Sequence, residues 1–154
     1  MILYLDASAA VKRYVQEPGS LEVQQAIADA DAVGTSVISL AEMTAALRRA
    51  IHVGTLVEAE AEVARRRLET EWPDYIRVQV TETLIERAKD LAWKHRVRGY
   101  DAVHLASGLV WQAGLGAGVT FATFDVHLWK AAQAEGLSIF PAELPPLLDA
   151  WRQG

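Results

Sequence analysis

The feature of this sequence that most constrains its fold is a repeated alternation between short apolar runs and segments with helical periodicity. The run at residues 2–5 (ILYL) has no polar alternation, which suits a strand buried on both faces, as in a parallel sheet. Further strands are predicted at 33–38, 76–80, 119–122 and 137–140. This order predicts an α/β fold in which helices cover both faces of a parallel sheet of about five strands.

The helical segments between these strands carry recognisable capping residues. Ser8, Ser20 and Thr81 each precede a helical pattern and are predicted to cap it. Ser39 is also a predicted cap, and Glu42 follows it at the spacing of a capping box. Helices are predicted over about 9–14, 20–28, 40–51, 55–71, 81–92, 101–110 and 126–135, followed by an irregular, proline-containing tail with a short last helix.

The length and composition of the chain limit the kinds of site it can build. With 154 residues the chain can bury a core without staples, and the absence of any linker, repeat or low-complexity segment predicts one domain over 1–154. The absence of cysteine excludes a disulfide and a thiolate metal site. No apolar run approaches the roughly 20 residues of a membrane span, and the N-terminus lacks the features of a signal peptide. We therefore expect a cytoplasmic protein with no membrane partner.

The net charge of −5 counts against a nucleic-acid function, because proteins that bind nucleic acids usually carry a basic face. The objection is weakened because four of the acids are candidate metal ligands, whose charge bound cations would offset. The basic residues are concentrated in the middle third of the chain, where they alternate with glutamates in the pattern of solvated helix faces. Arg48 and Arg49 stay open to two interpretations, which are contact with RNA phosphates or with a partner's acids, and simple surface solubility.

Four acidic residues occupy corresponding places in the predicted topology. Asp6 ends the first strand, Glu42 and Asp101 open helices, and Asp125 follows the fourth strand. In a doubly wound parallel sheet these positions share one edge, which is where ligands bind. Each of Glu42, Asp101 and Asp125 taken alone is also explained by the preference of acids for the first turn of a helix. Capping explains Asp6 poorly. The prediction of a shared ligand site depends on the four acids taken together.

Carboxylates that converge disfavour ionisation unless a cation compensates their charge. The cations that suit all-oxygen sites are Mg²⁺, Mn²⁺ and Ca²⁺, and Mg²⁺ commonly binds through one or two carboxylates together with substrate phosphates. Such a site activates water and stabilises charge on a phosphodiester. The acidic residues therefore predict metal-dependent hydrolysis of a phosphate ester.

Four stretches carry a resemblance to a known family. They are YLDASAAVKRYVQEPGS, TSVISLAEMTAALRR, RGYDAVHLASGL and TFATFDVHL, and they span nearly the whole chain. In order and spacing the sequence resembles PIN-domain ribonucleases, and among them the VapC-type toxins of type II toxin–antitoxin systems. The first and third stretches are the more specific, and no acidic position departs from the family pattern.

The resemblance implies a PIN-like three-layer sandwich and an endoribonuclease that depends on Mg²⁺, with Mn²⁺ as a substitute. It implies that Asp6 and Asp101 are the principal metal ligands and that Glu42 and Asp125 complete the quartet. Thr123 is similar to a family hydroxyl that orients water or a carboxylate. Ser8 holds a comparable supporting position, and local capping remains the alternative for both hydroxyl residues.

The resemblance also implies partners. These are an RNA substrate, with tRNA or rRNA favoured, a VapB-type antitoxin whose tail fills the acidic cleft, and a second copy of the chain in a homodimer. The helix pair over about 41–71 is the region around which the antitoxin is expected to wrap. Hydrolysis is expected to leave a 5′-phosphate and a 3′-hydroxyl.

Three further interpretations come from single residues and from rival functions. His104 is expected to have a packing or hydrogen-bonding role, and Trp93, Trp111 and Trp129 are expected to pack in the core. The rivals to the nuclease are a catalytically silent PIN-fold binding module and a receiver-type phosphoryl signalling module. A receiver module needs paired acids at the end of its first strand and a lysine after a late strand. In this sequence Asp6 has no acidic neighbour, and no lysine follows a late strand. Cleavage of structured DNA by the same site is a third alternative.

Overall fold

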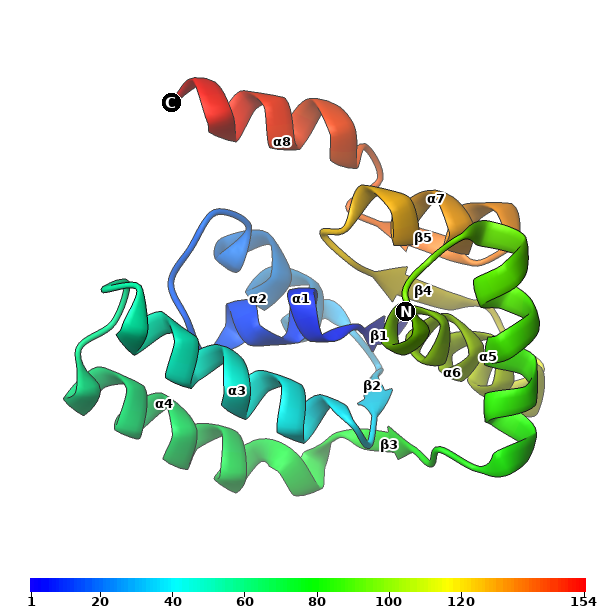
Figure 1. The fold of residues 1–154 in the computed structure, drawn as a ribbon, viewed down its shortest axis with the longest axis horizontal. Coiled ribbons are helices and arrows are strands. Elements are labelled where there is room, and N and C mark those ends of the chain that lie inside the picture. The colour runs from blue at the N-terminus through cyan, green and yellow to red at the C-terminus, as the bar shows by residue number, and fades with distance from the viewer.

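The computed structural model describes residues 1–154 and is built on one parallel sheet of five strands in the order β3-β2-β1-β4-β5. Figure 1 shows this sheet at the centre of the molecule with helices on either side. The strands are β1 (Ile2–Leu5), β2 (Ala32–Ser36), β3 (Ile76–Val78), β4 (Val119–Ala122) and β5 (Ser138–Phe140). The predicted α/β architecture and the number of strands are confirmed.

Eight helices surround the sheet, together with two short 3₁₀ turns at Val11–Arg13 (η1) and Trp72–Asp74 (η2). The helices are α1 (Ala7–Ala10), α2 (Ser20–Asp29), α3 (Ser39–His52), α4 (Glu58–Glu71), α5 (Glu82–His95), α6 (Gly99–Leu115), α7 (Val126–Ala134) and α8 (Leu144–Gln153). None of them is long and apolar enough to cross a membrane.

The central strand β1 explains why its sequence lacks polar alternation. Tyr4 points into a core formed with α5, α6 and α7, while Leu3 and Leu5 point into a second core formed with α1 to α4. All three side chains are fully buried. Successive side chains of a strand face opposite sides of the sheet, so a central strand between two helical layers must be apolar at every position.

Several predicted element ends differ from the structure. The second strand ends at Ser36, two residues before its predicted end, because the backbone of Ile38 is already in the right-handed helical region as the N-cap of α3. Ser20 and Ser39 are the first residues of their helices and do not cap them. The cap predicted at Thr81 is confirmed, since its side chain accepts a hydrogen bond from the Leu84 amide at 3.1 Å.

The three tryptophans predicted to lie in the core have different environments. Trp129 is buried, and its indole N–H donates to the Pro141 carbonyl at 2.7 Å, while Trp111 is partly buried against the core. The prediction for Trp93 is wrong, because its side chain is 89% exposed. Trp93 lies two positions beyond Leu91, which belongs to the buried stripe of α5, and two residues turn a helix to its opposite face.

The last helix, α8, packs back onto the loop that follows β4. The ring of Trp151 stacks on Phe124 with centroids 5.8 Å apart, and the ammonium group of Lys12 lies 4.5 Å from the Phe124 centroid. Gly19, at φ 91°, leaves room for both rings, since a Cβ there would lie 2.8 Å from Trp151. The short last helix predicted in the tail is a ten-residue helix with a defined contact, and Pro145 and Pro146 lie in its first turn, where they are tolerated.

The stacked pair predicts a local effect of replacing Trp151. In Trp151→Ala, hydrogen exchange at the Phe124 and Asp125 amides should be about three- to tenfold faster, because an aromatic pair contributes about 0.5–1.5 kcal/mol beyond its buried area. Exchange measured by mass spectrometry checks this. Arg152→Ala, on the same helix at an exposed position, is the control and should leave the loop unchanged. Equal exchange in the two variants would contradict the contact.

Candidate active site

The four acidic side chains singled out by the sequence line one cavity of about 220 Å³. Asp6 follows β1, Glu42 and Asp101 lie in the first turns of α3 and α6, and Asp125 precedes α7. The strands involved run parallel, so the ends that carry these residues meet at the carboxyl edge of the sheet. The convergence predicted from the topology is therefore observed.

Asp6 is the most buried of the four acids, with 3% of its surface exposed. One carboxylate oxygen accepts hydrogen bonds from the Ala9 amide at 2.9 Å and the Ser8 hydroxyl at 2.7 Å. The other accepts from the Thr123 hydroxyl at 2.6 Å. Burial raises the pKa of Asp6, while nearby His104 and these hydrogen bonds act in the opposite direction.

The capping expectations for this region are wrong in an informative way. Asp6, for which capping was a poor explanation, is the N-cap of α1, and Ser8, the predicted cap, lies inside that helix. A carboxylate at an N-cap position is stabilised by the first amides of the helix. The helix start therefore fixes the orientation of Asp6 as it enters the cavity.

Thr123 and Ser8 serve the site and not only their own turns. The Thr123 hydroxyl is fully buried, donates to Asp6 and accepts from the Asp125 amide at 3.1 Å. The Ser8 hydroxyl donates to Asp6 and accepts from the Phe124 amide at 3.0 Å. Both hydroxyls thus join the end of β1 to the loop after β4, and Phe124, whose amide donates to Ser8, is the residue on which Trp151 of α8 stacks.

Glu42 does not complete the predicted capping box. Its carboxylate instead contacts the imidazole Nε2 of His104 at 2.7 Å, and the Nδ1 of the same ring contacts the Tyr4 hydroxyl at 2.8 Å. His104 is 1% exposed, which agrees with the packing or hydrogen-bonding role expected for it. A side chain from α6 and another from β1 therefore hold a glutamate that belongs to α3.

Sequence reasoning missed Tyr100 and Arg98, which also line this cavity, and it grouped Arg98 with the solvated bases. The guanidinium of Arg98 lies 3.4 Å from the Asp101 carboxylate and 3.6 Å from that of Asp125. Burial raises the pKa of Asp101, the neighbouring charge of Asp125 adds to the rise, and Arg98 opposes it. The spacing of Arg98 and Asp101, three residues apart at a helix start, is the signal that identifies such a pair.

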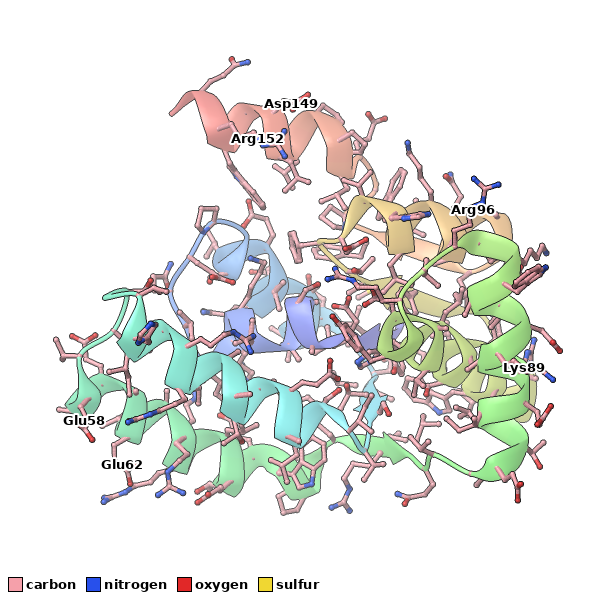
Figure 2. All side chains as sticks on the ribbon, in the orientation of Figure 1. Glu58, Glu62, Lys89, Arg96, Asp149 and Arg152 are labelled. Atoms are coloured by element: carbon pink, nitrogen blue, oxygen red, sulfur yellow. The ribbon has the colours of Figure 1, made fainter.

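The bases of α4 behave as the charge pattern predicted. Arg65 pairs with Glu62 and Glu69 along α4, and Arg66 pairs with the same Glu62. Figure 2 shows Glu58 and Glu62 on the outward side of α4, away from the centre of the molecule. These residues form a solvated helix face.

The donor set of the cavity fits a hydrated, hard divalent cation. All four acids offer carboxylate oxygens, which Mg²⁺ and Mn²⁺ prefer, and the raised pKa values of Asp6 and Asp101 mark charges that a cation would stabilise. No three of the Asp, Glu and His side chains approach one another closely enough to form a ready-made ligand cage. Mg²⁺ needs no such cage, since it retains several waters and commonly binds through one or two carboxylates.

The fold and this acidic cavity agree with the comparison of the sequence with known families. The model of the PIN domain family matches residues 3–134, and the chain therefore belongs to that family. Within it the chain is of the VapC type. It is 37% identical over 145 residues to "Ribonuclease VapC45" and to "Ribonuclease VapC49", from two strains of Mycobacterium tuberculosis (CDC 1551 / Oshkosh and ATCC 25618 / H37Rv). Each alignment covers 94% of this chain and 99% of the relative.

Solved structures agree with the assignment of the fold. FitAcB from Neisseria gonorrhoeae superposes with a TM-score of 0.63 at 18% identity, covering 92% of this chain and 98% of that one. FitAB bound to an IR36 DNA fragment gives a TM-score of 0.65 at 16% identity, covering 90% and 94%. At these identities the likeness concerns the fold alone, and it confirms the PIN-like sandwich.

The burial of Asp101 and its closeness to Asp125 predict that Asp101→Asn stabilises the metal-free protein. Because the pKa of Asp101 in the folded chain is raised above its unfolded value, its favourable contribution is complete below the unfolded pKa and is lost as the pH rises through the folded pKa. The variant should therefore melt at a higher temperature in EDTA at about pH 8, by roughly 2–4 °C for each kcal/mol of stability gained.

The gain in melting temperature should shrink toward about pH 4, where the wild-type carboxyl is increasingly protonated. Calorimetry across this pH range checks it, with Asp90→Asn on the exposed face of α5 as the control. A variant that melts below the wild type at neutral pH would show that the Asp101 charge is already compensated in the metal-free protein.

Proposed function

We propose that this protein is an endoribonuclease that hydrolyses RNA phosphodiester bonds at the acidic cavity and acts as the toxin of a toxin–antitoxin pair. The observation that carries the proposal is that Asp6, Glu42, Asp101 and Asp125 line a single cavity at the carboxyl edge of the sheet. The ribonuclease names of relatives that align over nearly the whole chain support RNA as the substrate.

We further propose that the cavity binds Mg²⁺, for which Mn²⁺ substitutes. Asp6 and Asp101 would be its principal ligands, and Glu42 and Asp125 would bind it directly or through water. When bound, the cation supplies positive charge that lowers the pKa of water and stabilises the charge that develops on the phosphate. All other groups that act in the cavity are side chains of the protein.

The protein side chains would contribute mainly orientation. Ser8 and Thr123 hold the carboxylate of Asp6 in one position, and His104 holds that of Glu42. In the hydrolysis a water oxygen bonds to phosphorus and the bond to the 3′ oxygen breaks. The attacking water gives up a proton and the leaving 3′ oxygen takes one up from solvent, which leaves a 5′-phosphate and a 3′-hydroxyl. Such a reaction slows sharply when a reactive group is misplaced. The hydrogen bonds that orient the carboxylates of Asp6 and Glu42 agree with this requirement.

The proposal includes two protein partners. A VapB-type antitoxin would place a basic segment in the acidic cavity. An arginine of that segment would pair with carboxylates there, as Arg98 of this chain does with Asp101 and Asp125. A second copy of the chain would form a homodimer. The RNA target would be a tRNA or an rRNA, as the resemblance to the family implies.

The proposal is tested by incubating purified total RNA with the protein, isolated without its antitoxin, in Mg²⁺, in Mn²⁺ and in EDTA. Wild type should give discrete fragments only with metal. Asp6→Asn and Glu42→Gln should lose at least about 100-fold in rate, because even residues that only support a metal ligand typically cost 10–100-fold. Asp90→Asn, an exposed acid outside the cavity, should cut at the wild-type rate.

Circular dichroism of each variant separates loss of activity from loss of fold. Fragments that persist in EDTA, or in Asp6→Asn, would contradict the acidic cavity as the active site. An intact wild type that cuts neither tRNA nor rRNA under either metal would instead favour the catalytically silent PIN-fold binding module.

A further inference from the structure

We propose that Tyr100, Arg98 and Arg49 form a nucleotide-binding subsite on the rim of the acidic cavity, which takes a single-stranded segment of RNA. In this subsite the Tyr100 ring stacks on an unpaired base, and the two arginines hold phosphates on either side of the bond that is cut. The inference rests on the proposed ribonuclease function and deepens it by naming the class of substrate.

Tyr100 is an aromatic side chain with no core to pack in. It lines the cavity from the first turn of α6 and is 49% exposed. The other tyrosines, Tyr4, Tyr14 and Tyr75, are all buried. An exposed ring at the mouth of a cavity offers a face on which a base can stack, and stacking of this kind is the usual means of holding single-stranded nucleic acid.

Arg98 is held loosely enough to exchange its partners for a phosphate. Its distances of 3.4 Å to Asp101 and 3.6 Å to Asp125 exceed those of strong charge-assisted hydrogen bonds, which are about 2.7–2.9 Å. Its side chain is 68% exposed, and ion pairs at exposed positions are weak. A guanidinium also matches the two oxygens of a phosphate, so RNA would be a better partner than the spaced carboxylates.

Arg98 lies close enough to Tyr100 for one nucleotide to contact both, with its base on the ring and its phosphate on the guanidinium. The guanidinium carbon lies 5.6 Å from the centroid of the Tyr100 ring. A nucleotide whose base lies against this ring therefore brings its phosphate close to a cation, within the same cavity that holds the acids. Arg49, exposed on α3, lines the cavity from a different element and supplies a second cation for the next phosphate.

The overall charge favours a local arrangement of this kind. The net charge is −5, and Arg65 and Arg66 are paired with glutamates along α4, so these two arginines are not free to hold the backbone of an RNA duplex. A few cations and one aromatic ring beside the acids can instead hold a short unpaired segment. A base inside a duplex is already stacked on both faces and cannot reach the Tyr100 ring.

The test uses a Glu42→Gln protein in Mg²⁺, in which cleavage is suppressed but neither Arg98 nor Tyr100 is altered. Fluorescence anisotropy measures its affinity for a short labelled RNA strand of mixed sequence and for the same strand annealed to its complement. Tyr100→Ala, added to this protein, should weaken binding of the single strand about tenfold, because one stacked base is lost. Tyr100→Phe should restore it.

Salt titrations separate the arginines from the tyrosine. Arg98→Ala and Arg49→Ala should each reduce the slope of log affinity against log salt by about 0.7, the value for one phosphate contact on a single strand. Tyr100→Ala should leave the slope unchanged. Trp93→Ala, which removes an exposed aromatic ring outside the cavity, is the matched control and should change neither affinity nor slope.

The inference is overturned if Tyr100→Ala leaves single-strand affinity unchanged, if the duplex binds as tightly as the single strand, or if no single-strand binding is measurable. The same variants are also tested for binding of a labelled basic peptide. If Tyr100→Ala or Arg98→Ala weakens binding of the peptide but not of RNA, the inference is overturned and the rim serves a protein partner. These binding readouts are independent of cleavage. A wild type that cuts no RNA removes the proposed function, whereas a wild type that cuts while Tyr100→Ala binds normally removes the subsite alone.

Discussion

A carboxylate buried at the end of the central strand is the constraint on which the rest of this structure depends. Asp6 is 3% exposed, so the hydration that it loses must be replaced by donors from the protein. One set comes from the start of α1, immediately after β1, and the other from Thr123 at the end of β4. Supplying both requires α1 to begin directly at Asp6 and β4 to lie beside β1, which is the arrangement that the sheet has.

The same constraint reconciles an acidic chain with a proposed function on RNA. Four acids gather at one edge of the sheet, and burial together with the neighbouring charge of Asp125 raises the pKa of Asp101. Cations from the chain lie at the rim of that cavity, while the arginines of α4 are neutralised by neighbouring glutamates. Charge is therefore organised locally around the cavity, and the net charge of the whole chain is a poor guide to its ligand.

The last twenty residues extend this organisation beyond the part of the chain that the PIN family model matches, which ends at residue 134. Trp151 of α8 stacks on Phe124, and Phe124 lies between Thr123 and Asp125, two residues of the candidate site. Lys12 covers another part of the same ring. The backbone amides of Thr123, Phe124 and Asp125 all donate hydrogen bonds, and the packed aromatic contact adds a further restraint on the same loop.

The sequence by itself determined the features that depend on local periodicity and on topology. The apolar strand runs and the helical segments predicted a five-stranded parallel sheet, and the places of Asp6, Glu42, Asp101 and Asp125 in that order predicted one shared edge. This inference succeeds because strand ends in a parallel sheet meet whatever the details of packing. The resemblance to the PIN family pointed to the same residues.

Only the tertiary structure decided which groups these acids bind. Glu42 has the spacing of a capping box with Ser39, yet its partner is His104, 62 residues further along the chain. Thr123 lies 117 residues from the Asp6 that it supports, and Arg98 contacts both Asp101 and Asp125. Spacing along the chain reports local geometry, whereas a buried carboxylate takes whichever donor the packing of distant elements brings within hydrogen-bond distance. The sequence therefore determined where the acids gather, and packing determined what holds them there.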